Sequence, residues 1–338
     1  MIKALKTVAS KVVKFVWWAA LLLLGFVSGG FAWLQSPLSM TSDNVELAIE
    51  PGTSSRAVGQ AIADAGVNTS PLLFYTWFRL SGQSRLIRAG NYEIGRGDTP
   101  WTLTEKLVRG QETLRSVTLV EGWTFRQMMS ALAKADGLRS DTHGLSPEQI
   151  MQKLGRGDLS AEGRFFPDTY TYARGSSDLA VLKRASHAME KQIAEIWKSR
   201  APDTPLKTSD EALTLASIVE KETGRSSDRP QIAGVFVNRL RVGMLLQTDP
   251  TVIYGLGPQF DGNLRKRDLQ SDSPWNTYVH AGLPPTPIAM PGKEALVAAV
   301  RPAQTKALYF VARGDGSSQF SNTLEEHNRA VAHFQRKQ

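Results

Sequence analysis

The sequence predicts an α+β protein with a single N-terminal transmembrane helix, a small module of strand–helix units and a larger α+β domain. Three observations lead to this prediction. One uncharged apolar stretch near the N-terminus is long enough to cross a bilayer. Downstream, short alternating segments are followed by segments with helical spacing, with turn-forming residues between them. The 338 residues are about twice the ~150 typical of one domain, so two folded units fit in the chain.

The composition excludes several classes of protein. Hydrophobic residues make up 41% and charged residues 21%, which is incompatible with wholesale disorder and with a polytopic membrane protein. Because the chain has no cysteine, disulfides, thiol nucleophiles and cysteine-ligated metals are excluded. A net charge of +8 suits an anionic partner. Half of that excess lies in four lysines before the apolar stretch, so the rest is only mildly basic and we expect no nucleic-acid partner.

The apolar stretch runs from Phe15 to Leu34 and has 20 residues, or ~30 Å as a helix, which matches the bilayer core. Tryptophans lie near both of its ends, where indole rings favour the membrane interface. Lysines precede this stretch, and no lysine follows directly after it. This asymmetry predicts a basic cytoplasmic tip at 1–14, a helix that spans the cytoplasmic (inner) membrane at 15–36, and an exported remainder. A cleaved signal peptide is the alternative, but the run is long and no small-x-small cleavage site follows it.

The first exported residues repeat one plan of strand, turn and helix. Val45–Ile49 alternates like a strand and Ala57–Ala65 has helical spacing. Ser116–Leu119 and Phe125–Ala135 repeat the plan, with a looser copy from 90 to 110. Such units are common in many folds, but these resemble LysM modules, which bind N-acetylated glycan chains. We therefore expect a LysM-like glycan-binding region at 44–150 and a catalytic domain at 151–338.

A helix that carries two candidate acids is predicted from Thr208 to Thr223. Its start has a capping box and Gly224 follows its end. Glu220 and Glu222 lie at opposite edges of its apolar face, about 200° apart, so they cannot act as a pair on one bond. Either lies in the last turn, where the helix dipole and apolar neighbours raise a carboxyl pKa, as a general acid at neutral pH requires. Geometry does not choose between them, and two solvated flank residues are the alternative.

Further blocks of sequence carry a family resemblance. ASIVEKE (216–222), NRL (238–240), LQTDPTVIYG (246–255), NTY (276–278), GLPPTPI (282–288), LYFVA (308–312) and EHN (326–328) follow in that order. Together they resemble the YceG-like family of endolytic murein transglycosylases over essentially the whole exported chain. The resemblance implies cleavage of the β-1,4 bond between N-acetylmuramic acid and N-acetylglucosamine without water, which leaves a 1,6-anhydro end. It also implies action on nascent glycan strands near the membrane, beside penicillin-binding synthases.

By the same resemblance, the glutamate of ASIVE, Glu220, is the catalytic general acid and base. A single acid is sufficient because the attacking muramic C6 hydroxyl belongs to the substrate and has a high effective concentration. The substrate-binding candidates are amide, acidic and aromatic side chains that suit sugar hydroxyl groups, N-acetyl groups and pyranose faces: Gln247, Asn276, Asn238, Tyr254, Tyr278, Glu222 and Asp249. The alternative for these residues is that they satisfy buried turns.

Two other functions remain open. One is a noncatalytic, membrane-anchored murein-binding scaffold, and the other is a hydrolytic muramidase. A metal hydrolase is disfavoured because the five histidines lack ligand spacing, and no phosphate-binding loop or dinucleotide fingerprint is present. We therefore expect neither a metal nor a cofactor.

Overall fold

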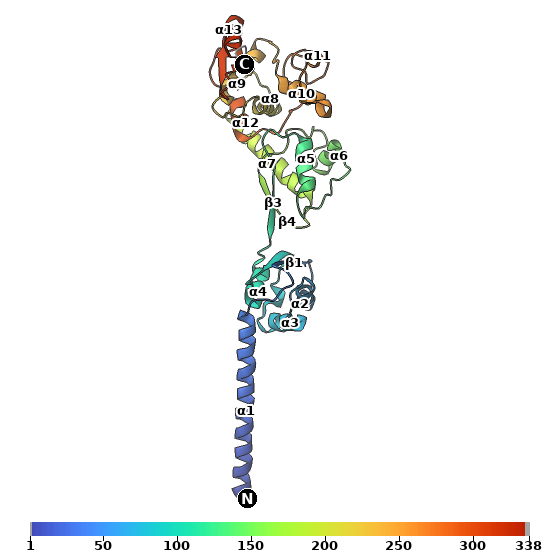
Figure 1. Ribbon diagram of the computed structural model, residues 1–338, viewed down its shortest axis with the longest axis vertical. Coiled ribbons are helices and arrows are strands. Elements are labelled where there is room, and N and C mark those ends of the chain that lie inside the picture. The colour runs from blue at the N-terminus through green and yellow to red at the C-terminus, as the bar shows by residue number, and fades with distance from the viewer. Residues whose placement is uncertain (1, 335–338) are drawn as a thin grey trace. The chain divides into compact units, whose positions relative to one another are not determined.

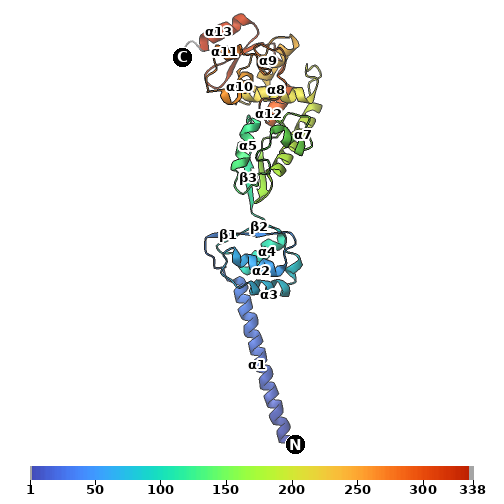
Figure 2. The ribbon, with the colours of Figure 1, turned by 90° about the vertical axis from the view of Figure 1, so that its right-hand side faces the viewer.

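The computed structural model describes residues 2–334, with side chains at residue 15 and from residue 17 onward (Figures 1 and 2). The chain divides after Leu114 into two compact units, Met1–Leu114 and Arg115–Gln338. Helices alternate with short strands that pair into two-stranded sheets, β1–β2, β3–β4 and β5–β6. The predicted α+β class is therefore confirmed.

The first unit begins with α1 (Ile2–Gln35). Its segment Trp17–Gln35 has a mean hydropathy of 1.6 and is 6% buried, so it is apolar, exposed and long enough to cross a membrane. At its end, the Trp33 ring packs edge-on against Phe74, with ring centroids 5.4 Å apart. The predicted span at 15–36 agrees with this helix in length and composition.

The rest of the first unit is a small helical module with a two-stranded antiparallel sheet of β1 (Asn44–Ile49) and β2 (Gly90–Gly95). Its helices are α2 (Ser55–Asp64), α3 (Pro71–Leu80), the short η1 (Gln83–Arg85) and α4 (Pro100–Arg109). The buried alternate positions of β1, Val45, Leu47 and Ile49, face one core with side chains from α2, α3 and α4.

The second unit has two hydrophobic clusters that α7 (Asp178–Lys198) connects. The first half of α7 packs with β3 (Leu114–Thr118), α5 (Phe125–Lys134), α6 (Pro147–Lys153) and β4 (Thr169–Ala173). Its second half packs with α8 (Ser209–Glu222), α9 (Arg229–Arg241) and α12 (Lys293–Val300).

The expected boundary at residue 150 is therefore corrected. The three predicted strand–helix units are present as β1–α2, β2–α4 and β3–α5, but the third belongs to the second unit. Its residues Val117 and Phe125 share a core with Val181 and Leu182 of α7, so a division at residue 150 would cut through one hydrophobic cluster.

The remaining elements of the second unit surround the end of α8. They are α10 (Asp249–Leu256), η2 (Gly257–Gln259), α11 (Lys266–Leu269), the antiparallel strands β5 (Tyr309–Ala312) and β6 (Ser318–Ser321), and α13 (Leu324–Phe334). Every residue of α8 from Ala212 to Val219 is buried. The charged groups of this central helix therefore lie in its first and last turns, with Asp210 and Glu211 at the start and three charged residues at the end.

Candidate active site

The last turn of α8 directs three consecutive charged side chains to different neighbours. The helix starts as predicted, with the Thr208 hydroxyl accepting the Glu211 N–H at 3.1 Å. Because successive residues are about 100° apart on a helix, Glu220, Lys221 and Glu222 meet separate surroundings. These surroundings distinguish the two candidate acids.

Glu222 lies in a cavity of about 580 Å³ between α8, α9, α10, β5 and α13. Four of the predicted site residues line it together: Glu222, Gln247, Asp249 and Tyr278. The cavity is therefore the place where the fold brings together segments 216–222, 246–255 and 276–278.

The segment Leu246–Asp249 builds one wall of the Glu222 cavity. Leu246 and Thr248 are buried, whereas Gln247 and Asp249 are exposed and line the cavity. Gln247 has a φ of 48°, the only positive φ of a non-glycine residue among those described. Such strained backbone is maintained only where the surrounding structure enforces it, and it concentrates at functional sites.

Each of the two carboxyl groups in this cavity accepts a hydrogen bond from a side-chain hydroxyl group. The Thr248 hydroxyl donates to Glu222 Oε1, and the Tyr278 hydroxyl donates to Asp249 Oδ1 at 2.5 Å. Burial, and then the bonded carboxylate of Asp249, raises the pKa of Tyr278, so its phenol stays a neutral donor. Asp249 thus has one phenolic donor, and Glu222 has one hydroxyl donor.

Burial raises the pKa of Glu222 to about 7. The nearby Asp249 carboxylate adds to this rise, whereas the Thr248 hydrogen bond and the Arg239 guanidinium oppose it. Glu222 is also the last residue of α8, where the partial negative charge of the helix end favours a neutral carboxyl group. At neutral pH this side chain is therefore available in both protonation states.

Three further residues of this cavity, Arg239, Tyr309 and His327, were not among the predicted site residues. Arg239 is buried, donates to the carbonyls of Leu246 and Leu308 at 2.7 Å, and lies over the Tyr309 ring, 5.4 Å from its centroid. The His327 ring stacks on Tyr309 at 5.2 Å, and burial lowers its pKa. All three lie within the blocks NRL, LYFVA and EHN, so their position in those blocks is the signal that could have identified them.

Glu220 lies outside the Glu222 cavity and has a different environment from the one expected. Its side chain is 6% exposed, and Oε1 accepts from Arg229 Nη2 at 3.2 Å while Oε2 accepts the Gly292 N–H at 2.9 Å. The expectation of apolar surroundings is therefore wrong. Since Arg229 begins α9 and Gly292 precedes α12, the Glu220 carboxylate joins three helices of the core.

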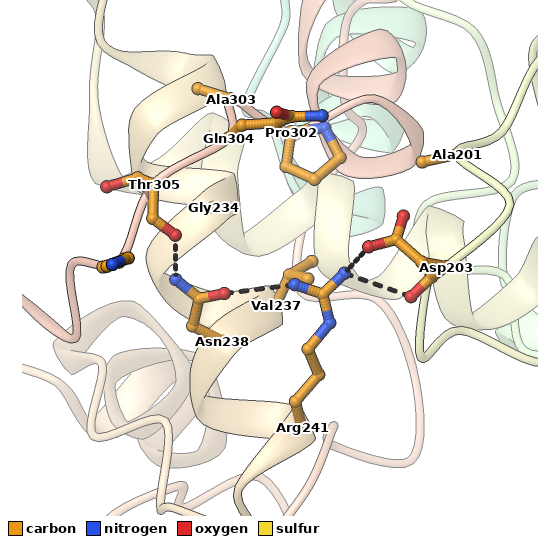
Figure 3. A pocket seen from close by; sticks show the side chains of 11 residues that line it. Ala201, Asp203, Gly234, Val237, Asn238, Arg241, Pro302, Ala303, Gln304 and Thr305 are labelled. Carbon is orange, nitrogen blue, oxygen red and sulfur yellow. Dashed lines mark hydrogen bonds and ion pairs between the residues drawn. The ribbon is translucent and has the colours of Figure 1, made fainter.

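The two predicted asparagines are occupied within the protein. Asn276 is fully buried, its amide group donating to the carbonyls of Leu269 and Ser271 and its carbonyl accepting the Tyr278 N–H. Asn238 donates to the Thr305 carbonyl at 2.8 Å beside a separate cavity of about 380 Å³ (Figure 3). Neither lines the Glu222 cavity, and backbone carbonyls hold both side chains, Asn276 in a buried turn and Asn238 on α9.

Tyr254 lines a third cavity, of about 720 Å³, together with Trp275 and Glu162. Its ring meets Trp275 edge-on at 5.5 Å. Burial raises the pKa of Glu162 to about 7, although its carboxylate accepts the Phe125 N–H at 2.8 Å. The sequence analysis did not identify Glu162 as an acid. Tyr254 therefore lies apart from the four residues around Glu222.

The chemistry that the Glu222 cavity offers is proton transfer and hydrogen bonding. It presents a carboxylic acid, a second carboxylate, an amide and two phenols, which suit sugar hydroxyl and N-acetyl groups. Within residues 2–334, no group of three or more His, Asp or Glu side chains is arranged to hold a metal ion.

Comparisons with known proteins place these observations in a family. A profile of the YceG-like family matches residues 47–333. An endolytic murein transglycosylase of Bacillus subtilis is 31% identical over 90% of this chain and 89% of that protein. An endolytic murein transglycosylase of Streptococcus pneumoniae is 28% identical over 95% of this chain, which spans 64% of that longer protein. The crystal structure of a yceG-like protein from Listeria monocytogenes has a TM-score of 0.54 and 29% identity, covering 85% of this chain and 98% of that one.

Proposed function

The chain belongs to the YceG-like family and is a murein transglycosylase, and from this premise we propose that it cleaves glycan strands in the cavity around Glu222. The reaction is endolytic and non-hydrolytic, and Glu222 is its general acid and base. The observation that carries the proposal is that a buried carboxyl group with a pKa of about 7 lines the same cavity as Gln247, Asp249 and Tyr278.

This proposal moves the acid from Glu220 to Glu222, two residues along the same helix. Both oxygens of the Glu220 carboxylate have partners within the protein, Arg229 and the Gly292 N–H. Glu222 has one side-chain partner, Thr248, and lies in a cavity. A general acid needs a proton at neutral pH and access to the leaving oxygen, and Glu222 meets both needs.

The proposed reaction uses one carboxyl group twice, first as an acid and then as a base. The Glu222 carboxylic acid protonates the glycosidic oxygen as the bond from muramic C1 to that oxygen breaks. The resulting carboxylate then takes the proton of the muramic C6 hydroxyl as its oxygen bonds to C1, which closes the 1,6-anhydro ring. No water is consumed. Because the attacking hydroxyl belongs to the substrate, its effective concentration is high, and a second catalytic carboxylate is not needed.

The other cavity residues position the sugar. Gln247 offers an amide for the N-acetyl or hydroxyl groups, and its strained backbone fixes the direction of that side chain. The Tyr278 ring offers an aromatic face for a pyranose ring. The negative charge of Asp249 favours the protonated form of Glu222 before the reaction and the positive charge that develops at C1 during it.

Asp249 also supports the second candidate function, a hydrolytic muramidase. Ordinary glycosidases use two carboxyl groups, and Asp249 supplies a second one to this cavity. The two functions differ in the acceptor, which is water in the muramidase and the muramic C6 hydroxyl in the transglycosylase.

We assign membrane anchoring to α1 and glycan binding to the LysM-like first unit, as the sequence analysis predicted. The exposed apolar span of α1 supports the first assignment, and the strand–helix units β1–α2 and β2–α4 support the second. Residue boundaries for the glycan-binding unit follow the compact unit that ends at Leu114. Cooperation with penicillin-binding synthases stays a prediction of the family resemblance.

Product analysis tests the proposed reaction. The full chain in detergent, incubated with intact murein, is expected to release fragments that end in 1,6-anhydromuramic acid. Mass spectrometry separates them from muramidase products, which are heavier by one water. Products that are only of the heavier kind would replace the transglycosylase by the muramidase, and binding to murein without soluble product would favour the scaffold.

The reaction rate is expected to fall as the pH rises above about 7. Glu222 must carry its proton at the start of the reaction, and its pKa of about 7 means that the protonated fraction drops about tenfold per pH unit beyond that point. Initial rates of anhydro-product formation between pH 5 and pH 9 measure this alkaline limb of the pH–rate profile. A rate that stays constant to pH 9 would contradict the role of Glu222.

A stability measurement checks the same pKa without substrate. The pKa of Glu222 is raised from 4.5 to about 7 on folding, so the folded protein binds this proton more tightly than the unfolded chain does. The contribution of this group to the free energy of unfolding is therefore complete below about pH 4.5 and is lost as the pH rises through 7. Comparison of the wild type with Glu222→Gln at each pH isolates this group.

A further inference from the structure

Helix α3 of the first unit is apolar on two opposite faces. Phe74 and Phe78 lie in the core of the module with no exposed area. Leu72, Leu73 and Leu80 are 66%, 46% and 76% exposed. At 100° per residue, these three leucines form one stripe, the leucine stripe, on the side of α3 away from the two phenylalanines. A helix with apolar residues all around it is normally covered on all sides, so the leucine stripe calls for a partner.

Helix α3 lies beside the end of the membrane-spanning helix. Both views of the first unit place α3 at the end of the module where α1 joins it (Figures 1 and 2). The Trp33 ring, in the last turns of α1, packs on Phe74 of α3 with ring centroids 5.4 Å apart. Since the apolar span of α1 ends at Gln35, Trp33 is at the depth where a bilayer meets water, and α3 lies at the same depth.

The direction of the stripe follows from the packing of α3. Phe74 and Phe78 point into the module, so the leucines on the opposite side point away from it. Trp77 lies next to this stripe on the helix and packs against Trp101, which is 42% exposed, with ring centroids 5.7 Å apart. An indole pair beside exposed leucines is the composition of a helix that rests in a membrane interface.

The charged residues of α3 and of the segment that follows it to residue 90 are all basic. Residues 71–90 contain three arginines, Arg79, Arg85 and Arg88, all exposed, and no acidic residue. Leu86, between the last two of them, is 56% exposed. Basic residues close to apolar ones favour anionic lipid head groups, where each contributes attraction within a Debye length of the surface.

We propose that α3 is an interfacial helix that rests on the outer surface of the anchoring membrane, with the leucine stripe at the acyl boundary and the arginines on anionic head groups. The inference rests on the proposed membrane span of α1. It gives the first unit a second attachment besides α1, so this unit is held flat against the bilayer and does not turn freely about one helix.

Spin labels on single cysteines test the proposal, because the chain has no cysteine of its own. The full chain is reconstituted in vesicles of phosphatidylcholine and phosphatidylglycerol, with one label at Leu80→Cys, Ala48→Cys or Val27→Cys. Ala48 is an exposed residue of β1 and is the control for water, and Val27, 58% exposed in α1, is the control for the span. Collision rates with oxygen, which concentrates in lipid, and with a water-soluble nickel chelate report the depth of each label.

The Leu80 label is expected to be severalfold more accessible to oxygen, and less accessible to the chelate, than the Ala48 label. A Leu80 label as accessible to the chelate as the Ala48 label would overturn the inference, and an embedded Val27 label would show that the anchor itself is intact. A Val27 label in water would overturn the anchor and the inference together. Shielding of Leu80 that disappears when the ratio of protein to lipid is lowered would assign the stripe to a second copy of this protein and also overturn the inference.

Discussion

Replacing Glu222 by glutamine is expected to reduce anhydro-product formation by ~10²–10⁴-fold, because glutamine cannot transfer a proton. The change keeps the shape of the side chain and an oxygen that can accept the Thr248 hydrogen bond. It also resembles the neutral form that burial favours, so the melting temperature should not fall. Initial rates on soluble glycan strands and thermal unfolding by circular dichroism measure the two effects.

Glu220→Gln is the matched control, since it makes the same chemical change two residues away. It weakens the contacts with Arg229 and Gly292, and we expect a loss of about 1–3 kcal/mol in the free energy of unfolding. Its activity, measured where it is fully folded, should stay within a few-fold of the wild type. The reverse pattern, with an active Glu222→Gln and an inactive Glu220→Gln, would return the acid to the residue that the family resemblance implies.

Replacing Arg239 by methionine is expected to have the largest effect on stability. Methionine fills much of the same volume but leaves the carbonyls of Leu246 and Leu308 without their charged donor inside the protein. Each buried acceptor without a partner costs about 1–3 kcal/mol, so the total is about 2–6 kcal/mol. For a unit of this size, that lowers the melting temperature by about 4 °C or more.

Arg241→Met is the control for Arg239→Met, because Arg241 is on the same helix but more exposed, where it pairs with Asp203. Its loss should cost less than about 1 kcal/mol. Arg239→Met should also shift the alkaline limb of the rate profile to higher pH, because the guanidinium opposes the rise in the pKa of Glu222. Equal melting temperatures for the two variants would mean that Arg239 does not hold the cavity wall.

Local sequence was sufficient to predict α8 but not the role of its two acids. The capping residue Thr208 and the periodicity of the apolar positions lie within the helix itself, and the structure confirms that helix. The partner that distinguishes Glu220, the Gly292 N–H, comes from 72 residues further along the chain. The spacing of Glu220 and Glu222 within one helix shows that their side chains point in different directions, but it does not show which residues contact each carboxylate.

The missed helix α3 has a related explanation. Its sequence, PLLFYTWFRL, is apolar on nearly all sides, so the contrast between a polar and an apolar face that identifies a helix is weak. The domain boundary was misplaced because α7 serves two clusters, one with Val181 and Leu182 and one with Ile193 and Ile196. Its pattern shows a long apolar face, and only the folded chain shows that the face is divided between two sets of neighbours.

The shared helix α7 has a mechanical consequence. With 21 residues, it is about 32 Å long and carries buried side chains at both ends. Neither half of the second unit can lose its packing without exposing part of the same rod, so the two halves are expected to melt together. Because α7 packs against both β4 and α8, a tilt of this helix would displace both elements.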